Sequence, residues 1–159
     1  MPTPAASPIP AGFHSLTPHL VCKNALAAMD FYVKAFDGVE EMRLLTPDGQ
    51  LMHGCIRIGD APLMIGDECP QYSVVGPLTL KGSPVLIHLY VPDVDATMAK
   101  AEAAGATVTM PPQEMFWGDR YGQLVDPFGH LWSVATCKYD MTAEETVQAA
   151  RDFPCQPAT

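Results

Sequence analysis

The chain has 159 residues, of which 48% are hydrophobic, and its 18 acidic and 9 basic side chains give a formal net charge of -9. This apolar content supports a folded core and excludes global disorder, and the length suits one domain or two half-size modules. The longest uncharged apolar run, Val85 to Val91, is far short of the ~20 residues of a membrane span. The negative charge repels phosphates, so we expect no nucleic-acid and no membrane partner.

The first 12 residues and the cysteines indicate the expected cellular compartment. Residues 1–12 contain four prolines within ten positions and lack a basic start followed by an apolar stretch, so they predict a flexible tail and no secretory signal. The cysteines are odd in number and lack CxxC spacing, which favours reduced thiols and a cytoplasmic protein. They are Cys22, Cys55, Cys69, Cys137 and Cys155.

The first half of the chain predicts a strand, a helix and three further strands. Apolar residues recur at helical spacing after Asn24, the expected N-cap, and Gly38 follows as the expected C-cap glycine. Pro47-Asp48-Gly49 lies between two apolar runs and predicts a hairpin turn. In chain order we expect a strand over 13–21, a helix over 25–36, and strands over 39–45, 51–58 and 61–65.

The second half repeats this order after a linker at 67–84 that is rich in glycine and proline. Asp93 or Asp95 is the expected cap of an alanine-rich helix that stops at Gly105. Thr142 and Glu145 form a capping box that opens a short helix in a C-terminal extension, 138–159. The expected strands are 85–91, 106–110, 123–125 and 131–135, and the last helix ends near 153.

The two halves therefore form an internal repeat with an offset of 69 residues, which aligns His19 with His88 and Asn24 with Asp93. The repeat predicts an α+β fold of two tandem βαβββ modules, 13–66 and 85–137, within a single domain over 13–137. Each module buries one sheet face under its helix, and we expect the sheets to curve round a shared cleft.

Several segments carry a family resemblance. They are the run from His19 to Tyr32, MHGCIRIGD (52–60), LIHLYVPDVDA (86–96) and FWGDRYGQLVDPFGHLW (116–132), which contains Asp126-Pro127-Phe128-Gly129-His130. Together they resemble the vicinal oxygen chelate superfamily of glyoxalases, bleomycin resistance proteins and dioxygenases, and the longer ones its PhnB-like subgroup. The resemblance implies a small-molecule ligand in the cleft and a homodimer.

In catalytic members of that superfamily, four inward-pointing ligands hold a divalent metal. The resemblance places these positions at Thr17, Leu86 and Ser133, with the fourth near 63–65. Leucine cannot bind a metal, and a lone hydroxyl is a poor ligand beside a carboxylate or imidazole. The resemblance therefore implies that the usual metal site has been lost.

Histidines nearby offer a different metal site. His19 and His88 lie two residues beyond the family positions and so share their strand face. With His53 they could supply three imidazoles to a divalent metal that keeps an open position for substrate. The alternative is a metal-free cavity in which these histidines only form hydrogen bonds.

Two strand segments supply the other candidate ligand-binding residues. If Ile56 and Ile58 face the helix, the residues that alternate with them face the cleft. Segment 115–121 combines aromatic surface with Arg120, which could pair with an anionic group; the alternative is an Asp119–Arg120 ion pair among core aromatics. The expected substrate-binding residues are His19, His53, Cys55, Arg57, His88, Trp117, Arg120, Tyr121 and Ser133.

Other side chains are expected to be structural. Trp132 alternates away from Ser133 and should pack under a helix, whereas His14 and His130 should face solvent. Two functions remain open. One is a metal-dependent lyase, isomerase or dioxygenase-type enzyme that uses the three histidines, with no catalytic residue assigned. The other is a metal-free protein that binds or sequesters a drug-like molecule, as bleomycin resistance proteins do, and whose acidity favours cationic ligands.

Overall fold

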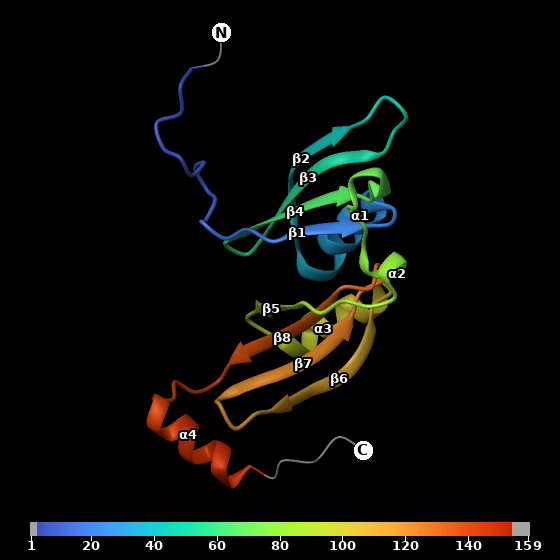
Figure 1. The fold of residues 1–159 in the computed structure, drawn as a ribbon. Helices are drawn as coiled ribbons and strands as arrows, with labels where there is room; N and C mark the ends of the chain where they lie inside the picture. Colours follow the sequence, from blue (N-terminus) through green and yellow to red (C-terminus); the bar gives the residue numbers. More distant parts are fainter. Residues whose placement is uncertain (1–2, 154–159) are drawn as a thin grey trace. The chain divides into compact units, whose positions relative to one another are not determined.

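The structure, a computed structural model, describes residues 3–153 and divides the chain into two compact units, one up to Gly82 and one from Ser83 (Figure 1). Each unit contains a four-stranded mixed sheet with a helix on one face, which confirms the predicted α+β fold of two βαβββ modules. Among the described residues, no helix has the length and apolar character needed to cross a membrane.

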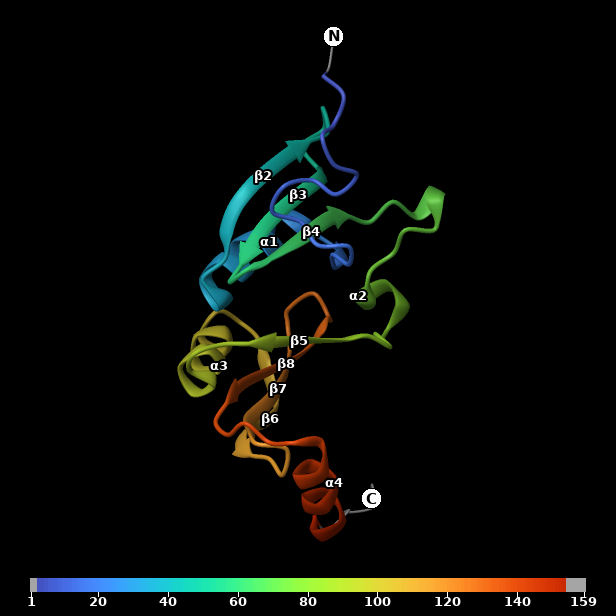
Figure 2. The same ribbon diagram turned by 90° about the vertical axis from the view of Figure 1, so that its left-hand side faces the viewer.

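Unit 1 has the strand order β1-β4-β3-β2, in which β1 runs parallel to β4 and the other pairs are antiparallel. Helix α1 covers one face of this sheet, as both views of the ribbon show (Figures 1 and 2). The elements of unit 1 are β1 (His19–Cys22), α1 (Ala25–Phe36), β2 (Val39–Leu45), β3 (Leu51–Ile58), β4 (Ala61–Asp67), the 3-10 turn η1 (Pro70–Tyr72) and α2 (Pro77–Leu80).

Helix α1 begins where the sequence predicted, because the Asn24 side chain accepts a hydrogen bond from the amide of Ala27. It also ends at Phe36 as predicted, but the C-cap residue differs by one position. Asp37, not Gly38, takes the left-handed conformation (φ 53°), and the amide of Gly38 donates to the carbonyl of Tyr32. Gly38 is needed for space, since a Cβ there would lie 2.6 Å from Cγ2 of Ile56 in the core.

Unit 2 repeats this topology with the strand order β5-β8-β7-β6, and helix α3 packs on one face of the sheet. Helix α4 follows the last strand. The elements of unit 2 are β5 (Leu86–Tyr90), α3 (Val94–Ala103), β6 (Thr107–Glu114), β7 (Asp119–Val125), β8 (Leu131–Cys137) and α4 (Ala143–Asp152).

The turn before β8 is built around a buried carboxylate. Asp126 accepts hydrogen bonds from the amides of Phe128 and His130 and from Nε1 of Trp132, each 2.9 Å long. Trp132 is fully buried, as predicted. The prediction for His130 was wrong: its side chain is 8% exposed, because the turn folds back around Asp126. His14 is exposed, as expected.

Other segments also differ from the sequence prediction, among them β7, which begins at Asp119 and not at 123. Strand β1 covers only the end of the expected 13–21 run, and the expected linker contains the short elements η1 and α2. Strand β6 continues through Pro111 and Pro112, which an edge strand tolerates because one side of its backbone needs no partner. The cysteines within the described residues are free, and Cys155 lies outside them.

The offset of 69 residues recurs in the strand pairing. His19 on β1 pairs with Met64 on β4, and His88 on β5 pairs with Ser133 on β8. The same offset relates both members of each pair, so Met64 is the unit 1 counterpart of Ser133. Met64 lies within 63–65, the stretch in which the resemblance implies the fourth ligand position.

Candidate functional site

Each sheet has an open face, defined here as the face opposite its covering helix. In unit 1, Gly54 faces helix α1, because a Cβ there would lie 2.6 Å from Sδ of Met29. Strand alternation then places the neighbouring residues of β3 on the open face. These residues are His53, Cys55 and Arg57.

Two imidazoles meet on the open face of unit 1. The ring centroids of His19 and His53 lie 5.8 Å apart, with planes at 86°. Gly66 lies next to His19, and a Cβ at this position would be in ordinary contact with Nε2 of His19 at 3.5 Å. Partial burial, together with the neighbouring charge of His53, lowers the pKa of His19 and favours its neutral form.

Arg57 and Cys55 have structural partners on the same face. Arg57 binds Glu41 through Nε at 2.6 Å and Nη2 at 3.1 Å, and Nη1 donates to the carbonyls of Gly12 and Asp60. Sγ of Cys55 donates to Glu41 at 3.6 Å. Burial raises the pKa of the Cys55 thiol, and the Glu41 contact adds to this effect. Cys55 is therefore not activated as a nucleophile.

The open face of unit 2 is centred on His88. Its Nδ1 lies 2.7 Å from Oγ of the buried Ser133, a hydrogen bond that fixes the imidazole on the sheet. The ring is stacked with Tyr121 at a centroid distance of 6.0 Å and lies edge-on to Tyr90 at 4.5 Å. The three rings thus project from two strands, β5 and β7, and Ser133 lies on β8 between them.

A buried carboxylate extends this cluster. Asp119, only 4% exposed, accepts hydrogen bonds at Oδ2 from the hydroxyl of Tyr90 at 3.0 Å and from Nε1 of Trp117 at 2.9 Å. Burial raises the pKa of Tyr90, as does its bond to Asp119, so Tyr90 keeps its proton. Trp117 lies 5.5 Å from Tyr121 in an edge-on arrangement. We call the rings of Tyr90, His88, Tyr121 and Trp117 the aromatic face.

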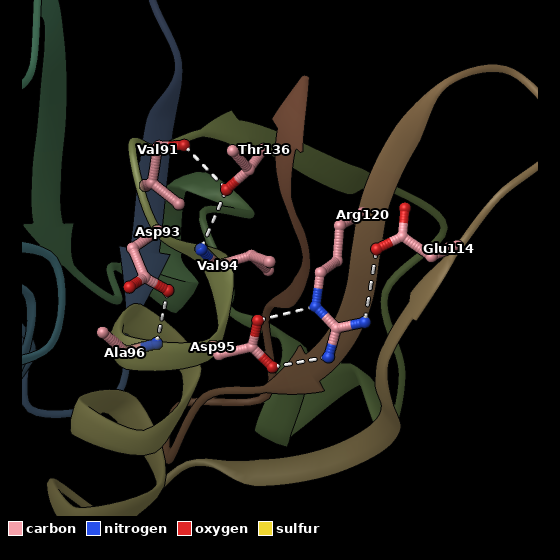
Figure 3. A network of polar contacts seen from close by, with 8 residues as sticks. All are labelled: Val91, Asp93, Val94, Asp95, Ala96, Glu114, Arg120 and Thr136. Carbon is pink, nitrogen blue, oxygen red and sulfur yellow. Dashed lines mark hydrogen bonds and ion pairs between the residues drawn. The ribbon is translucent and has the colours of Figure 1, made fainter. Parts of the chain in front are cut away.

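Arg120 lies on the opposite side of the sheet. Its guanidinium binds Asp95 of α3 through two hydrogen bonds of 2.6 and 2.7 Å and lies 3.7 Å from Glu114, as Figure 3 shows. This pairing lowers the pKa of Asp95. The predicted alternative, an ion pair between Asp119 and Arg120, does not form, because successive residues of a strand point to opposite faces of the sheet. Arg120 serves to fasten β7 to α3.

Further hydrogen bonds hold the start of α3 against the sheet (Figure 3). Oγ1 of Thr136 accepts from the amide of Val94 at 2.9 Å and donates to the carbonyl of Val91 at 3.0 Å. Asp93, one of the two predicted caps, accepts from the amide of Ala96. The sheet that carries the aromatic face is therefore tied to the start of α3 by hydrogen bonds.

The residues at the positions that the resemblance implies for metal ligands do not suit a divalent metal. These positions hold Thr17, Met64, Leu86 and Ser133, which offer hydroxyls, a thioether and an alkyl chain but no carboxylate or imidazole. The Ser133 hydroxyl is also engaged by His88. The donor set therefore argues against the usual metal of the superfamily at these four positions.

The alternative histidine site stays a prediction. Within residues 3–153, no three His, Cys, Asp or Glu side chains gather in an arrangement that could hold a metal ion. The structure brings His19 and His53 together in unit 1, whereas His88 belongs to unit 2 with its own partner, Ser133.

Three polar or aromatic contributors to the open face of unit 2 were not among the expected substrate-binding residues. Tyr90 shares a strand face with His88, and Asp119 and Gln123 share one with Tyr121, so strand alternation could have found them. Nε2 of Gln123 donates to the hydroxyl of Tyr121 at 2.7 Å. The missing signal was the start of β7 at Asp119, without which these residues could not be assigned to one strand.

Comparisons with known proteins agree with this architecture. The chain is 47% identical over 139 residues to the uncharacterized protein Mb0911c of Mycobacterium bovis, covering 86% of this chain and 91% of the relative. The structure of TioX from Micromonospora sp. ML1 is similar, with a TM-score of 0.62, 25% identity, and coverage of 78% of this chain and 98% of TioX.

A PhnB protein from Bacillus cereus shares the fold, with a TM-score of 0.61, 18% identity, and coverage of 77% of this chain and 99% of that one. The family model of the glyoxalase/bleomycin resistance protein/dioxygenase superfamily matches residues 12–134. The predicted resemblance is thereby confirmed, and the chain belongs to the glyoxalase/bleomycin resistance protein/dioxygenase superfamily.

Proposed function

We propose that this protein binds a small organic molecule on the aromatic face of unit 2, without a metal, and that the ligand carries an aromatic or other unsaturated ring. The observation that carries the proposal is the packing of four rings, three on strands and Trp117 on the turn before β7, held by hydrogen bonds to Ser133, Asp119 and Gln123. Aromatic rings held in place this way offer stacking surface at little cost in entropy. Tyr90, 60% exposed, keeps part of this surface accessible.

The charges of the sheet favour a neutral or cationic ligand. Arg120 is the only lysine or arginine in strands β5 to β8, and it is bound to Asp95 on the helix side. Asp119 is hydrogen-bonded to the polar edges of Tyr90 and Trp117, and the faces of these rings can attract an organic cation. This function is of the sequestering kind, as in the drug-binding branch of the superfamily.

A ligand panel tests this proposal. We expect 1-naphthylmethylamine to raise the melting midpoint most, 1-naphthol less, and 1-naphthalenesulfonate least. The naphthyl ring of all three can stack on the aromatic face, whereas the site favours the positive charge of the amine and disfavours the negative charge of the sulfonate. At about 100 times its Kd, a ligand that binds only the native state adds about 2.7 kcal/mol of stability. Cyclohexylmethylamine, which has the same charge but no aromatic ring, is the control. Equal shifts for the cyclohexyl and naphthyl amines would contradict the proposal.

A second candidate is a metal-dependent lyase, isomerase or dioxygenase-type enzyme that uses His19, His53 and His88. The contact between His19 and His53 favours it, since two imidazoles already lie together. On this hypothesis, tag-free protein purified without chelator contains stoichiometric metal, and His53→Ala and His88→Ala each remove it. His14→Ala, at an exposed histidine, is the matched control. Metal content at background level in the wild type would end this candidate.

We further propose that the protein acts in the cytoplasm as a homodimer. The free cysteines among the described residues support a reducing compartment, and dimers are common in the superfamily. Light scattering coupled to gel filtration measures the mass in solution directly; a mass near 17.2 kDa would show a monomer instead.

A further inference from the structure

The C-terminal extension, residues 138–153, lies beyond the segment that the family model matches and is attached to the turn that carries Trp117. The amides of Lys138 and Tyr139 both donate to the carbonyl of Gly118, each at 3.0 Å. Gly118 has φ +95°, and a Cβ there would lie 2.5 Å from the carbonyl oxygen of Tyr139. The turn and the extension are thus fitted closely to each other.

A series of ring contacts joins the end of this extension to the aromatic face. Phe153, immediately after α4, contacts Phe116 at a centroid distance of 5.1 Å. Phe116 is perpendicular to Trp117 at 4.9 Å, and Trp117 in turn lies 5.5 Å from Tyr121. Rings therefore touch in sequence from the last helix to the candidate binding surface.

Helix α4 packs little against the rest of unit 2. None of its residues is buried, and Val147 is 53% exposed. Its first turn is nevertheless well formed, because Thr142 and Glu145 make the predicted capping box. A preformed helix with little packing of its own depends on the contact at its end, so Phe153 is well placed to connect the extension to the site.

We propose that Phe153 is a positioning residue for the aromatic face: through Phe116 it holds the indole of Trp117 in place against Tyr121 and Asp119. The C-terminal extension would then set the affinity of the site, although it contributes no residue to the aromatic face itself. This inference rests on the proposed function for its effect on binding, but the orientation of Trp117 can be measured without any ligand.

The test uses iodide quenching of tryptophan fluorescence. The chain has two tryptophans, and Trp132 is 2% exposed, so iodide reaches only Trp117; Trp117→Phe confirms the assignment. We expect Phe153→Ala to raise the quenching constant about twofold and to weaken the binding of 1-naphthylmethylamine by about two- to tenfold, the range of a lost aromatic pair. Phe153→Tyr, which keeps the ring, should restore both values.

The matched control is Val147→Ala, an exposed apolar position on the same helix without a ring contact, which should change neither value. An unchanged quenching constant in Phe153→Ala would overturn the inference, as would an equal change in Val147→Ala. If 1-naphthylmethylamine does not bind the wild type, the proposed function fails, and the quenching of Trp117 then decides the positioning role by itself.

Discussion

Replacing Tyr121 with alanine is expected to weaken the binding of 1-naphthylmethylamine by about 10- to 100-fold, the loss typical of a central aromatic contact. Tyr121 is stacked with His88 and lies edge-on to Trp117, so its removal separates the two halves of the aromatic face. Titration calorimetry measures the change in Kd, with circular dichroism to establish that the variant is folded.

Two further variants sharpen this experiment. Tyr121→Phe keeps the ring and loses only the hydrogen bond from Gln123, so we expect it to retain most of the affinity. Tyr72→Ala removes a tyrosine that is 77% exposed in unit 1 and should leave Kd unchanged. Wild-type affinity in Tyr121→Ala would place the ligand elsewhere on the protein.

The largest loss of stability is expected from Asp126→Ala. Three buried or partly buried donors, the amides of Phe128 and His130 and Nε1 of Trp132, lose their acceptor together. Each unsatisfied buried donor costs about 1–3 kcal/mol, so the free energy of unfolding should fall by about 3–5 kcal/mol. Urea denaturation followed by tryptophan fluorescence measures this loss.

The control for Asp126→Ala is Asp48→Ala, at an exposed turn of similar composition in unit 1, where we expect a change below about 1 kcal/mol. Asp126→Asn should lie between the two, because an amide keeps the shape of the carboxylate but offers one acceptor oxygen in place of two. A loss below 1 kcal/mol in Asp126→Ala would mean that the turn finds other acceptors.

Local chemistry explains which elements could be predicted from the sequence. The start of α1 depends on Asn24 and on residues within one helical turn, and the hairpin of β2 and β3 depends on the turn between them. The length of β6 depends instead on its place at a sheet edge, which decides whether Pro111 and Pro112 are tolerated. Edge position is a property of topology, which short windows of sequence do not contain.

The candidate site also combines features that the sequence predicts with features that it does not. Strand alternation placed His53, Cys55 and Arg57 on one face, because side-chain direction follows from the period of a strand. Partner choice could not be predicted, since Arg120 finds Asp95 only after α3 packs on the sheet. The burial of His130 likewise depends on the three bonds to Asp126, whose donors become neighbours only in the folded turn.

The division into two units with separate cores affects how unfolding is observed. Both tryptophans, Trp117 and Trp132, belong to unit 2, whereas the largest buried ring of unit 1 is Tyr32. Tryptophan emission therefore monitors one half of the duplication, while far-ultraviolet circular dichroism monitors both. Coincident transitions would show that the two halves unfold cooperatively. Separate transitions would show that each half unfolds independently, as a single module would.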